Sequence, residues 1–600
     1  MADFSPTPPV SFPEFQPLSS AQWQAQLARE LKGTDPASLR WTLPGGVVAE
    51  PFYHREAWAA LGGPPASLPP RPVPCRNVVE LHVPAGTDGR LQVEQGADAL
   101  TRGADGLHFN LPGDPSAFAV AELAARLPLG ATWLGFSVTQ HPDALLARLR
   151  EAAAGQLLQG FLRFLPAAGP EGAELAPFRA MLRRCLALTR DWLEFSTLAV
   201  NGMYFGNRGG TLPQQLAFSL STAAALLAEL PCADNDLTLA EVARALHLDV
   251  AISPSFFPEI ARLRATRRLW ATLLHGFGLP PAGALALPIH AATSTWTQTT
   301  LDPHTNLLRH TTEAMSAVLG GADSVQVAPF DCLYQAPHEF SARLARNLPV
   351  LLREEAHLDW VADPAAGAYF VETLTDELAR AAWVEFQALE AQGGMGAPGA
   401  RARALEAVSQ AGLEKFKRIA TGQDVVVGTN RFQNPQETFD YNPKQLLRSR
   451  DFDTTRATYP SEVLRLATAL HFERRANQDK QAALVLLGRA NVIQDIAAAF
   501  WQLLHPGQPG PVPLPDLPAD TYSVLFSQPE EATLMYAGPA QFEHLARVVQ
   551  QVPNGHVFDI PSLISSDLAT LLEAVRVFGF KEFSVEGHKT EEVLARLQGR

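Results

Sequence analysis

The chain contains one Asp-x-His sequence, Asp302-Pro303-His304, and this spacing could support metal chemistry. In such a pair the aspartate accepts a hydrogen bond from one ring nitrogen, which fixes the tautomer and leaves the other nitrogen to bind a metal. The following residues, 305–307, include no glycine that would allow a tight loop beneath a bound ligand. We therefore interpret His304 as an ordinary residue of the fold and not as a metal ligand.

The cysteines could in principle bind a metal or act as nucleophiles. There are four, and none belongs to a Cys-x-x-Cys or Cys/His ligand pair: Cys75, Cys185, Cys232 and Cys332. Their spacing therefore indicates no zinc site. Four scattered cysteines in 600 residues are typical of reduced structural thiols in a cytosolic protein, and a catalytic thiol is the alternative.

Composition excludes several function classes. The formal charge is -14 and no dense Lys/Arg tract occurs, which argues against a nucleic-acid partner. The first residues carry no basic region followed by an apolar run, and no apolar stretch reaches the ~18 to 20 residues of a membrane span. We expect a cytoplasmic protein with no membrane association.

The elements that must position any site alternate between short apolar runs and helical stretches. Such alternation predicts a parallel sheet wrapped by helices, and over this length a (β/α)8 TIM-type barrel is the economical fold. The expected strands include 78–83, 131–138, 195–200 and 324–327, and the expected helices include 143–154, 214–230 and 308–319.

The chain is too long for one core, so we expect several units. Residues 1–40 predict a Pro-rich arm followed by a helix from a Ser20 cap to Lys32, residues 41–395 the barrel, and residues 396–480 a linker region. Residues 481–600 again alternate between strand and helix, which predicts a small α/β domain.

Five blocks in the barrel region resemble the methylmalonyl-CoA mutase family. They occur in the family's order, and together they span residues 265–395. They are Ala265–Trp270, Thr293–Trp296 with Asp302, Asn306, Arg309 and Glu313–Met315, Phe340–Asn347, Asp363–Tyr369 with Glu372–Thr375, and Gly393–Met395.

This resemblance implies a radical interconversion of succinyl-CoA and methylmalonyl-CoA that is started by adenosylcobalamin. The cofactor carries the difficult step, and the protein binds, orients and shields it. The resemblance implies a barrel that holds the substrate and a flavodoxin-like, cobalamin-binding-type domain at residues 481–600. In the family that domain supplies a histidine to cobalt from an Asp-x-His-x-x-Gly loop.

The chain departs from the family at the cobalt site. None of the histidines of residues 481–600 has an aspartate two positions before it: His505, His544, His556 and His588. We therefore expect a degenerate cobalamin-binding-like domain, no cofactor and no metal bound by this chain, and adenosylcobalamin in a partner subunit.

The substrate-side positions have also changed. Tyr204 stands where the family has the histidine that would hydrogen-bond the thioester carbonyl, and a phenol cannot become a cation near neutral pH. In the family's Arg-Ala-His-x-Gln-Thr-Ser-Gly-Trp segment, His290 survives, but Ala292 replaces the glutamine. We predict that Tyr204, His290 and Ala292 are degenerate positions and that the chain has no catalytic residue of its own.

Three functions fit these residues. The first is the non-catalytic small subunit of a heterodimeric methylmalonyl-CoA mutase, an isomerase only as a holoenzyme with its large catalytic subunit. The second is an active acyl-CoA mutase barrel whose cobalamin domain is a separate chain. The third is a barrel that binds an acyl-CoA or another metabolite without reaction.

The N-terminal arm is the expected contact with the partner subunit. Residues 1–18 combine five prolines with Phe4, Phe12 and Phe15, and they cannot form a core of their own. The helix that follows places Trp23, Leu27 and Leu31 on one apolar stripe that can lie on another surface. The alternative is that arm and stripe pack on the chain's own barrel.

Overall fold

The computed structural model describes most residues before 421 and short stretches after it. The described residues are 18–62, 74–165, 175–232, 237–280, 286–420, 424–429, 431–432, 441–442, 446, 456–459, 462, 484–489, 522–527 and 532–537.

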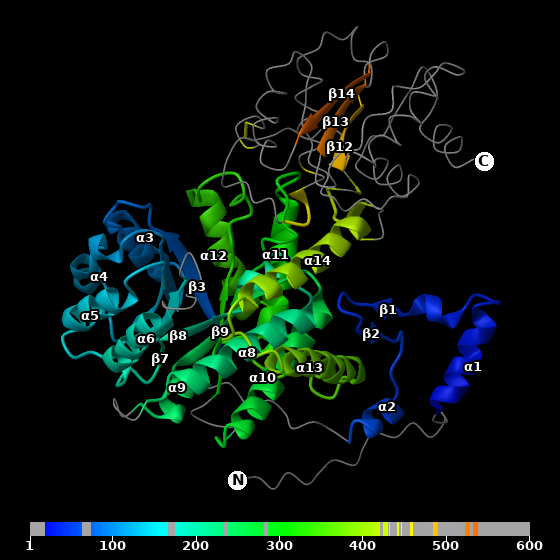
Figure 1. Ribbon diagram of the computed structural model, residues 1–600, viewed down its shortest axis with the longest axis horizontal. Helices are drawn as coiled ribbons and strands as arrows, with labels where there is room; N and C mark the ends of the chain where they lie inside the picture. Colours follow the sequence, from blue (N-terminus) through cyan, green and yellow to red (C-terminus); the bar gives the residue numbers. More distant parts are fainter. Residues whose placement is uncertain are drawn as a thin grey trace.

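A parallel β-barrel forms the body of the molecule (Figure 1). Its sheet has the order β7-β6-β5-β4-β3-β11-β10-β9-β8. The two end strands, β7 and β8, are separated only by Thr197, so the ends of the sheet meet at one stretch of chain. The predicted TIM-type barrel is thus confirmed. The strands are β3 (Arg76–His82), β4 (Gly106–Leu111), β5 (Trp133–Val138), β6 (Gln159–Phe164), β7 (Phe195–Ser196), β8 (Leu198–Asn201), β9 (Leu246–Ile252), β10 (Ile289–Thr293) and β11 (Ser324–Gln326).

Helices cover the outside of the barrel and bury the outward faces of its strands. Since the strands are then buried on both faces, their sequences are nearly continuous apolar runs, as in β5. The helices between the strands are α3 (Arg90–Thr101), α4 (Val120–Arg126), α5 (Pro142–Ala153), α6 (Leu175–Thr189), α7 (Met203–Gly206), α8 (Leu212–Glu229), α9 (Leu239–Ala245), α10 (Phe256–Gly276), α11 (Thr305–Gly320) and α12 (Glu339–Glu354).

Two apolar cores lie between sheet and helices. One joins β4 and β5 to α3–α5 and contains the fully buried rings of Phe109, Phe118 and Phe136. The other surrounds α8, which starts at a Thr211–Gln214 capping box. The α8 helix packs against both α10 and α13 (Tyr369–Glu390), so α8 is apolar on most of its surface.

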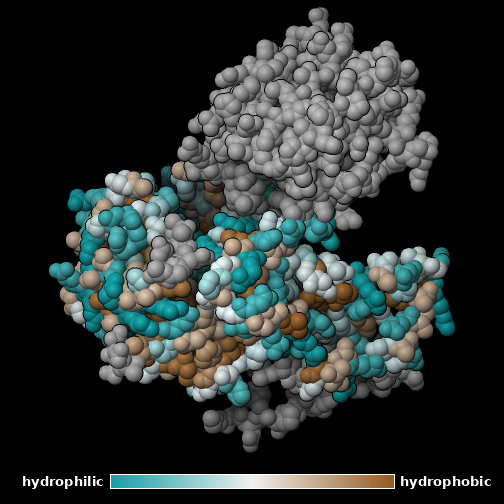
Figure 2. All heavy atoms as spheres, viewed as in Figure 1, coloured by the Kyte–Doolittle hydropathy of each residue, from teal (hydrophilic) through white to brown (hydrophobic). Residues whose placement is uncertain are grey.

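The N-terminal segment lies at the edge of the molecule (Figures 1 and 2). It comprises α1 (Ser20–Glu30), β1 (Trp41–Thr42), β2 (Val48–Ala49) and α2 (Arg55–Ala60). Trp58 contacts Tyr369 of α13 at 5.4 Å between ring centroids. The helix predicted from Ser20 is present, but its cap is Ser19, because the Ser19 hydroxyl accepts the Gln22 N–H in a capping box.

The α1 helix buries none of its residues. Its apolar stripe is only partly covered, and Trp23 stacks on Phe52 of the same segment at 4.5 Å. The Pro-rich residues 1–17 lie outside the described residues, so their predicted role as a partner contact stays a prediction.

The predicted linker contains a 21-residue helix, α14 (Ala400–Ala420). Beyond it, the buried residues Arg456 and Glu462 dock on the segment after β10. Arg456 donates to the Gln298 carbonyl at 2.9 Å, and the Thr300 N–H donates to Glu462 at 2.9 Å. This part of the segment therefore belongs to the packed structure of the barrel.

Three strands are described in the predicted C-terminal domain: β12 (Leu484–Arg489), β13 (Tyr522–Ser527) and β14 (Ala532–Ala537). They pair antiparallel in the order β12-β13-β14, whereas a flavodoxin-like sheet is parallel. The remainder of this domain lies outside the described residues, so its predicted fold is not confirmed. No helix in the described ranges is long and apolar enough to cross a bilayer.

Candidate functional site

The axis of the barrel is filled by aromatic and imidazole rings. Phe161 of β6 stacks on His290 of β10 with ring centroids 4.6 Å apart. Trp133, His247 and His108 surround Phe161 at 5.1 to 5.2 Å. These separations are those of rings in contact, so the rings leave no gap between them for a substrate chain.

A buried ion pair lies beside these rings. Arg163 of β6 donates twice to Asp249 of β9, at 2.9 and 2.5 Å, and both side chains are almost fully buried. His247 Nε2 lies 3.5 Å from the Asp249 carboxylate. Burial opposes ionisation of Asp249, but Arg163 and His247 outweigh it and lower the pKa of the carboxyl group. The pair fixes β6 to β9 across the barrel interior.

Two buried histidines of the barrel, His108 and His290, are held neutral. His108 contacts Ser137 Oγ at 2.7 Å and Gln326 Oε1 at 2.9 Å, and burial together with Arg163 lowers its pKa to about 4. Burial, assisted by His247, lowers the pKa of His290 well below its usual value. Neutral imidazoles in this position act as polar filling and not as proton donors.

His290 and Ala292 both lie on β10 inside the barrel. His290 Nδ1 contacts Ser324 Oγ at 2.9 Å, while Nε2 has no hydrogen-bond partner in the described structure. Ala292, two residues further along the strand, is buried and offers no polar group in place of the family's glutamine. The surviving histidine thus contacts the rings and not a cavity.

Tyr204 lies on α7, and its ring is a packing surface for two arginines. The guanidinium carbon of Arg208 lies 3.9 Å from the ring centroid, and that of Arg401 of α14 lies 5.0 Å from it. Cation–π contacts of this kind attach α14 to the end of β8. Tyr204 thus has a packing role where α7 meets α14.

Asp302 and His304 do not form a ligand pair. The Asp302 carboxylate accepts the hydroxyl of Thr305 at 2.6 Å, and His304 is exposed and stacks on Phe330 at 4.9 Å. No group of three potential ligands that could hold a metal occurs in the described ranges. The four histidines of residues 481–600 lie outside those ranges, so the absence of a cobalt ligand there stays a prediction.

Two of the cysteines, Cys185 and Cys332, carry no activated thiol. Burial, with Asp331 beside it, raises the pKa of Cys332 to about 12, and burial with Asp143 raises that of Cys185 to about 12. A thiol with so high a pKa is protonated at neutral pH and is a poor nucleophile. This favours the structural interpretation over the catalytic one.

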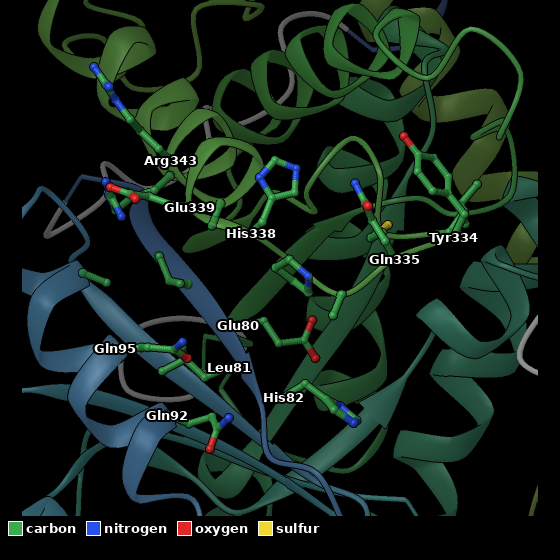
Figure 3. Close-up of a pocket in the computed structure, with 18 of the residues that line it drawn as sticks. Glu80, Leu81, His82, Gln92, Gln95, Tyr334, Gln335, His338, Glu339 and Arg343 are labelled. Carbon is green, nitrogen blue, oxygen red and sulfur yellow. The ribbon is translucent and has the colours of Figure 1, made fainter. Parts of the chain in front are cut away.

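A pocket of 1230 Å³ is lined by residues at the C-terminal end of β3, on α3 and on the chain from Cys332 to Arg346 (Figure 3). Glu80 and His82 at the end of β3 face it, and His338 and Gln335 line the opposite side. The His338 ring lies 3.0 Å from the buried Asp331 carboxylate. These residues were not predicted. The one local signal is the alternation of Glu80 and His82 at the end of a strand.

The comparisons with known proteins agree with this fold. A sequence model of the methylmalonyl-CoA mutase family matches residues 177–499. The chain therefore belongs to the methylmalonyl-CoA mutase family, as the five blocks predicted.

Among its relatives are two proteins named methylmalonyl-CoA mutase small subunit. The one from Porphyromonas gingivalis is 31% identical over 498 residues, which cover 76% of this chain and 78% of the relative. The one from Streptomyces virginiae is 30% identical, with 70% and 71% covered. A methylmalonyl-CoA mutase of Cereibacter sphaeroides is 28% identical, with 78% and 70% covered.

Proposed function

We propose that this chain is the non-catalytic small subunit of a heterodimeric, adenosylcobalamin-dependent methylmalonyl-CoA mutase. The holoenzyme interconverts succinyl-CoA and methylmalonyl-CoA, with the cofactor in the large subunit. The observation that carries the proposal is the ring packing of Phe161 with Trp133 and His290, which occupies the barrel interior.

The packed interior bears on activity because a barrel mutase must enclose its substrate. A thioester in this barrel would have to displace buried aromatic rings that contact one another. Ala292 also provides no hydrogen bond there, and Tyr204 is engaged by two arginines outside the ring cluster. A barrel that keeps its scaffold but not these polar groups still offers extensive surface to a partner.

A partner subunit is supported by the N-terminal segment and by the relatives' names. The α1 helix protrudes from the body with no residue buried, which leaves its surface available to another chain. The "small subunit" names of the relatives refer to proteins that accompany a larger subunit. We propose that the arm and α1 lie on that subunit.

The second candidate is an active acyl-CoA mutase barrel whose cobalamin domain is a separate chain. It requires an open barrel interior and a working residue at position 204. Phe161 and the arginine contacts of Tyr204 favour the non-catalytic role.

Reconstitution tests the proposal. The chain alone, with adenosylcobalamin and succinyl-CoA, should give no turnover, and a large subunit of the same family should supply it. A large-subunit variant without its cobalt-ligating histidine should abolish turnover of the complex. Residual turnover of that complex would assign the activity to this chain instead.

A further inference from the structure

The pocket at the end of β3 continues as a groove between α3 and α12. Arg102 at the end of α3 and Arg343 and Arg346 on α12 all line it. The Asn77 side-chain amide links the chain after α3 to α12, because it donates to the carbonyls of Gly103 at 3.1 Å and Arg346 at 2.9 Å. The groove is thus a formed feature, with three guanidinium groups along it.

Most of the acidic groups along the groove are already engaged. Glu80 accepts from Asn110 at 3.1 Å and from Gln326 at 2.6 Å. Asp98 accepts from Arg102 Nε at 2.8 Å, within α3. Neither carboxylate forms an ion pair with an arginine of α12 in the described structure, although the charge of Asp98 raises the pKa of Arg346.

Arg343 and Arg346 remain without a carboxylate at ion-pair distance in the described structure. Glu339 lies one turn before Arg343 but forms no ion pair with it there. The Nε of Arg346 is buried and has no hydrogen-bond partner in that same part of the chain. An unsatisfied buried donor on a charged group costs stability unless a ligand engages it.

The three arginines repel one another. Arg343 and Arg346 are three residues apart on α12, so they share one face of that helix. Burial and then the neighbouring charge of Arg102 lower the pKa of Arg346, Asp98 partly offsets them, and Arg343 contributes a smaller lowering. Like charges held this close are stabilised when an anion lies between them.

We propose that this groove binds a phosphorylated small molecule, with Arg343 and Arg346 of α12 and Arg102 of α3 holding its phosphoryl oxygens. Guanidinium groups match phosphate oxygens in paired hydrogen bonds. A phosphoryl group has enough charge and acceptors for several arginines, whereas a single carboxylate does not. The volume of 1230 Å³ exceeds the ~300 to 1,000 Å³ of common ligand pockets, which leaves room for the rest of a nucleotide-sized molecule.

Titration calorimetry of the full chain with inorganic pyrophosphate at low ionic strength tests this site. We expect saturable binding at one site, weakened at least tenfold in Arg346→Gln. Arg343 is exposed, so Arg343→Gln should fold normally and should also weaken binding at least tenfold. The matched control is Arg380→Gln, an exposed arginine of α13 that pairs with Asp376 away from the groove, and its binding should be unchanged.

Two results would overturn the proposal. One is the absence of saturable pyrophosphate binding in the wild-type chain. The other is equal binding by Arg343→Gln and Arg380→Gln, which each remove one positive charge; equality would mean that pyrophosphate senses only the overall charge. Adenosine diphosphate, titrated in parallel, distinguishes the source of the phosphoryl group: tighter binding than pyrophosphate indicates that the groove also holds the remainder of a nucleotide.

Discussion

At the scale of single residues, the chain keeps histidines in the barrel, but two of them are uncharged at neutral pH and closely packed. His108 and His290 are buried, their pKa values are lowered, and Phe161 lies between them. Tyr204 packs between two arginines. Each of these groups has a structural role that requires no chemistry.

Tyr204→Phe in the assembled complex should leave turnover within about twofold, because no proton transfer or oxyanion contact depends on the hydroxyl. The phenyl ring keeps its packing between Arg208 and Arg401. Steady-state kinetics of the complex measures this. A loss of ~100-fold, the scale of a removed catalytic hydrogen bond, would contradict the non-catalytic role.

Acid should destabilise the chain through its buried histidines. Burial, and then Arg309, lowers the pKa of His310 to about 3, whereas an unfolded histidine titrates near ~6.5. Between these values the unfolded state binds more protons, so the free energy of unfolding decreases as the pH falls, by about 1.4 kcal/mol per pH unit for one histidine.

His310→Leu should therefore reduce the pH dependence of stability between pH 6 and 4, the window set by those two pKa values. It should not destabilise the chain at pH 7.5, since neither ring nitrogen of His310 has a hydrogen-bond partner in the described structure. Thermal unfolding at several pH values measures this. A slope equal to that of the wild type would show that His310 is protonated in the folded state.

At the scale of elements, Arg456 and Glu462 form an ion pair with each other, and both hydrogen-bond to the segment after β10. Arg456 and Glu462 are fully buried, and their side chains are 2.5 Å apart. Glu462→Gln removes the negative charge and leaves Arg456 buried without it, so we expect a loss of about 3 kcal/mol in the free energy of unfolding. Chemical denaturation measures that loss.

The control is Glu122→Gln, which removes an exposed pair with Arg126 on α4 and should cost less than about 1 kcal/mol. If both variants lose the same small amount, the buried pair does not hold the segment on the barrel.

Much of the barrel could be predicted from the sequence, because strands buried on both faces are nearly continuous apolar runs. The expected runs at 78–83, 131–138 and 324–327 coincide with β3, β5 and β11. The helix at 400–420 was not predicted, since its polar, Arg-rich sequence resembles a linker.

The candidate site was harder to predict than the fold. The loss of polar groups at Tyr204 and Ala292 could be recognised from the family's motifs. The ring packing could not be predicted, because the hydrophobic periodicity of a strand buried on both faces does not tell which face points to the barrel axis. Phe161, Trp133 and His290 come from three strands that only the closed sheet brings together.

At the scale of the whole molecule, α1 of the N-terminal segment buries none of its residues on the barrel. We predict that Phe4, Phe12 and Phe15 changed together to Ser weaken assembly with the large subunit, because aromatic residues dominate the energy of interfaces. A titration that measures the affinity between the subunits provides the test.

Deletion of residues 1–33 should have a larger effect, since it also removes α1 and its stripe. The barrel contacts of Trp58 and Tyr53 remain in that variant, so the body should still fold. Unchanged affinity in both variants would mean that the segment serves this chain alone.

Retention of the corrin tests the central claim most directly. The purified chain and its complex with the large subunit are each incubated with adenosylcobalamin, desalted, and measured by absorbance. The chain alone should retain none, and the complex should retain one corrin per heterodimer. Stoichiometric retention by the chain alone, or two corrins per heterodimer, would contradict the account of a subunit without its own cofactor.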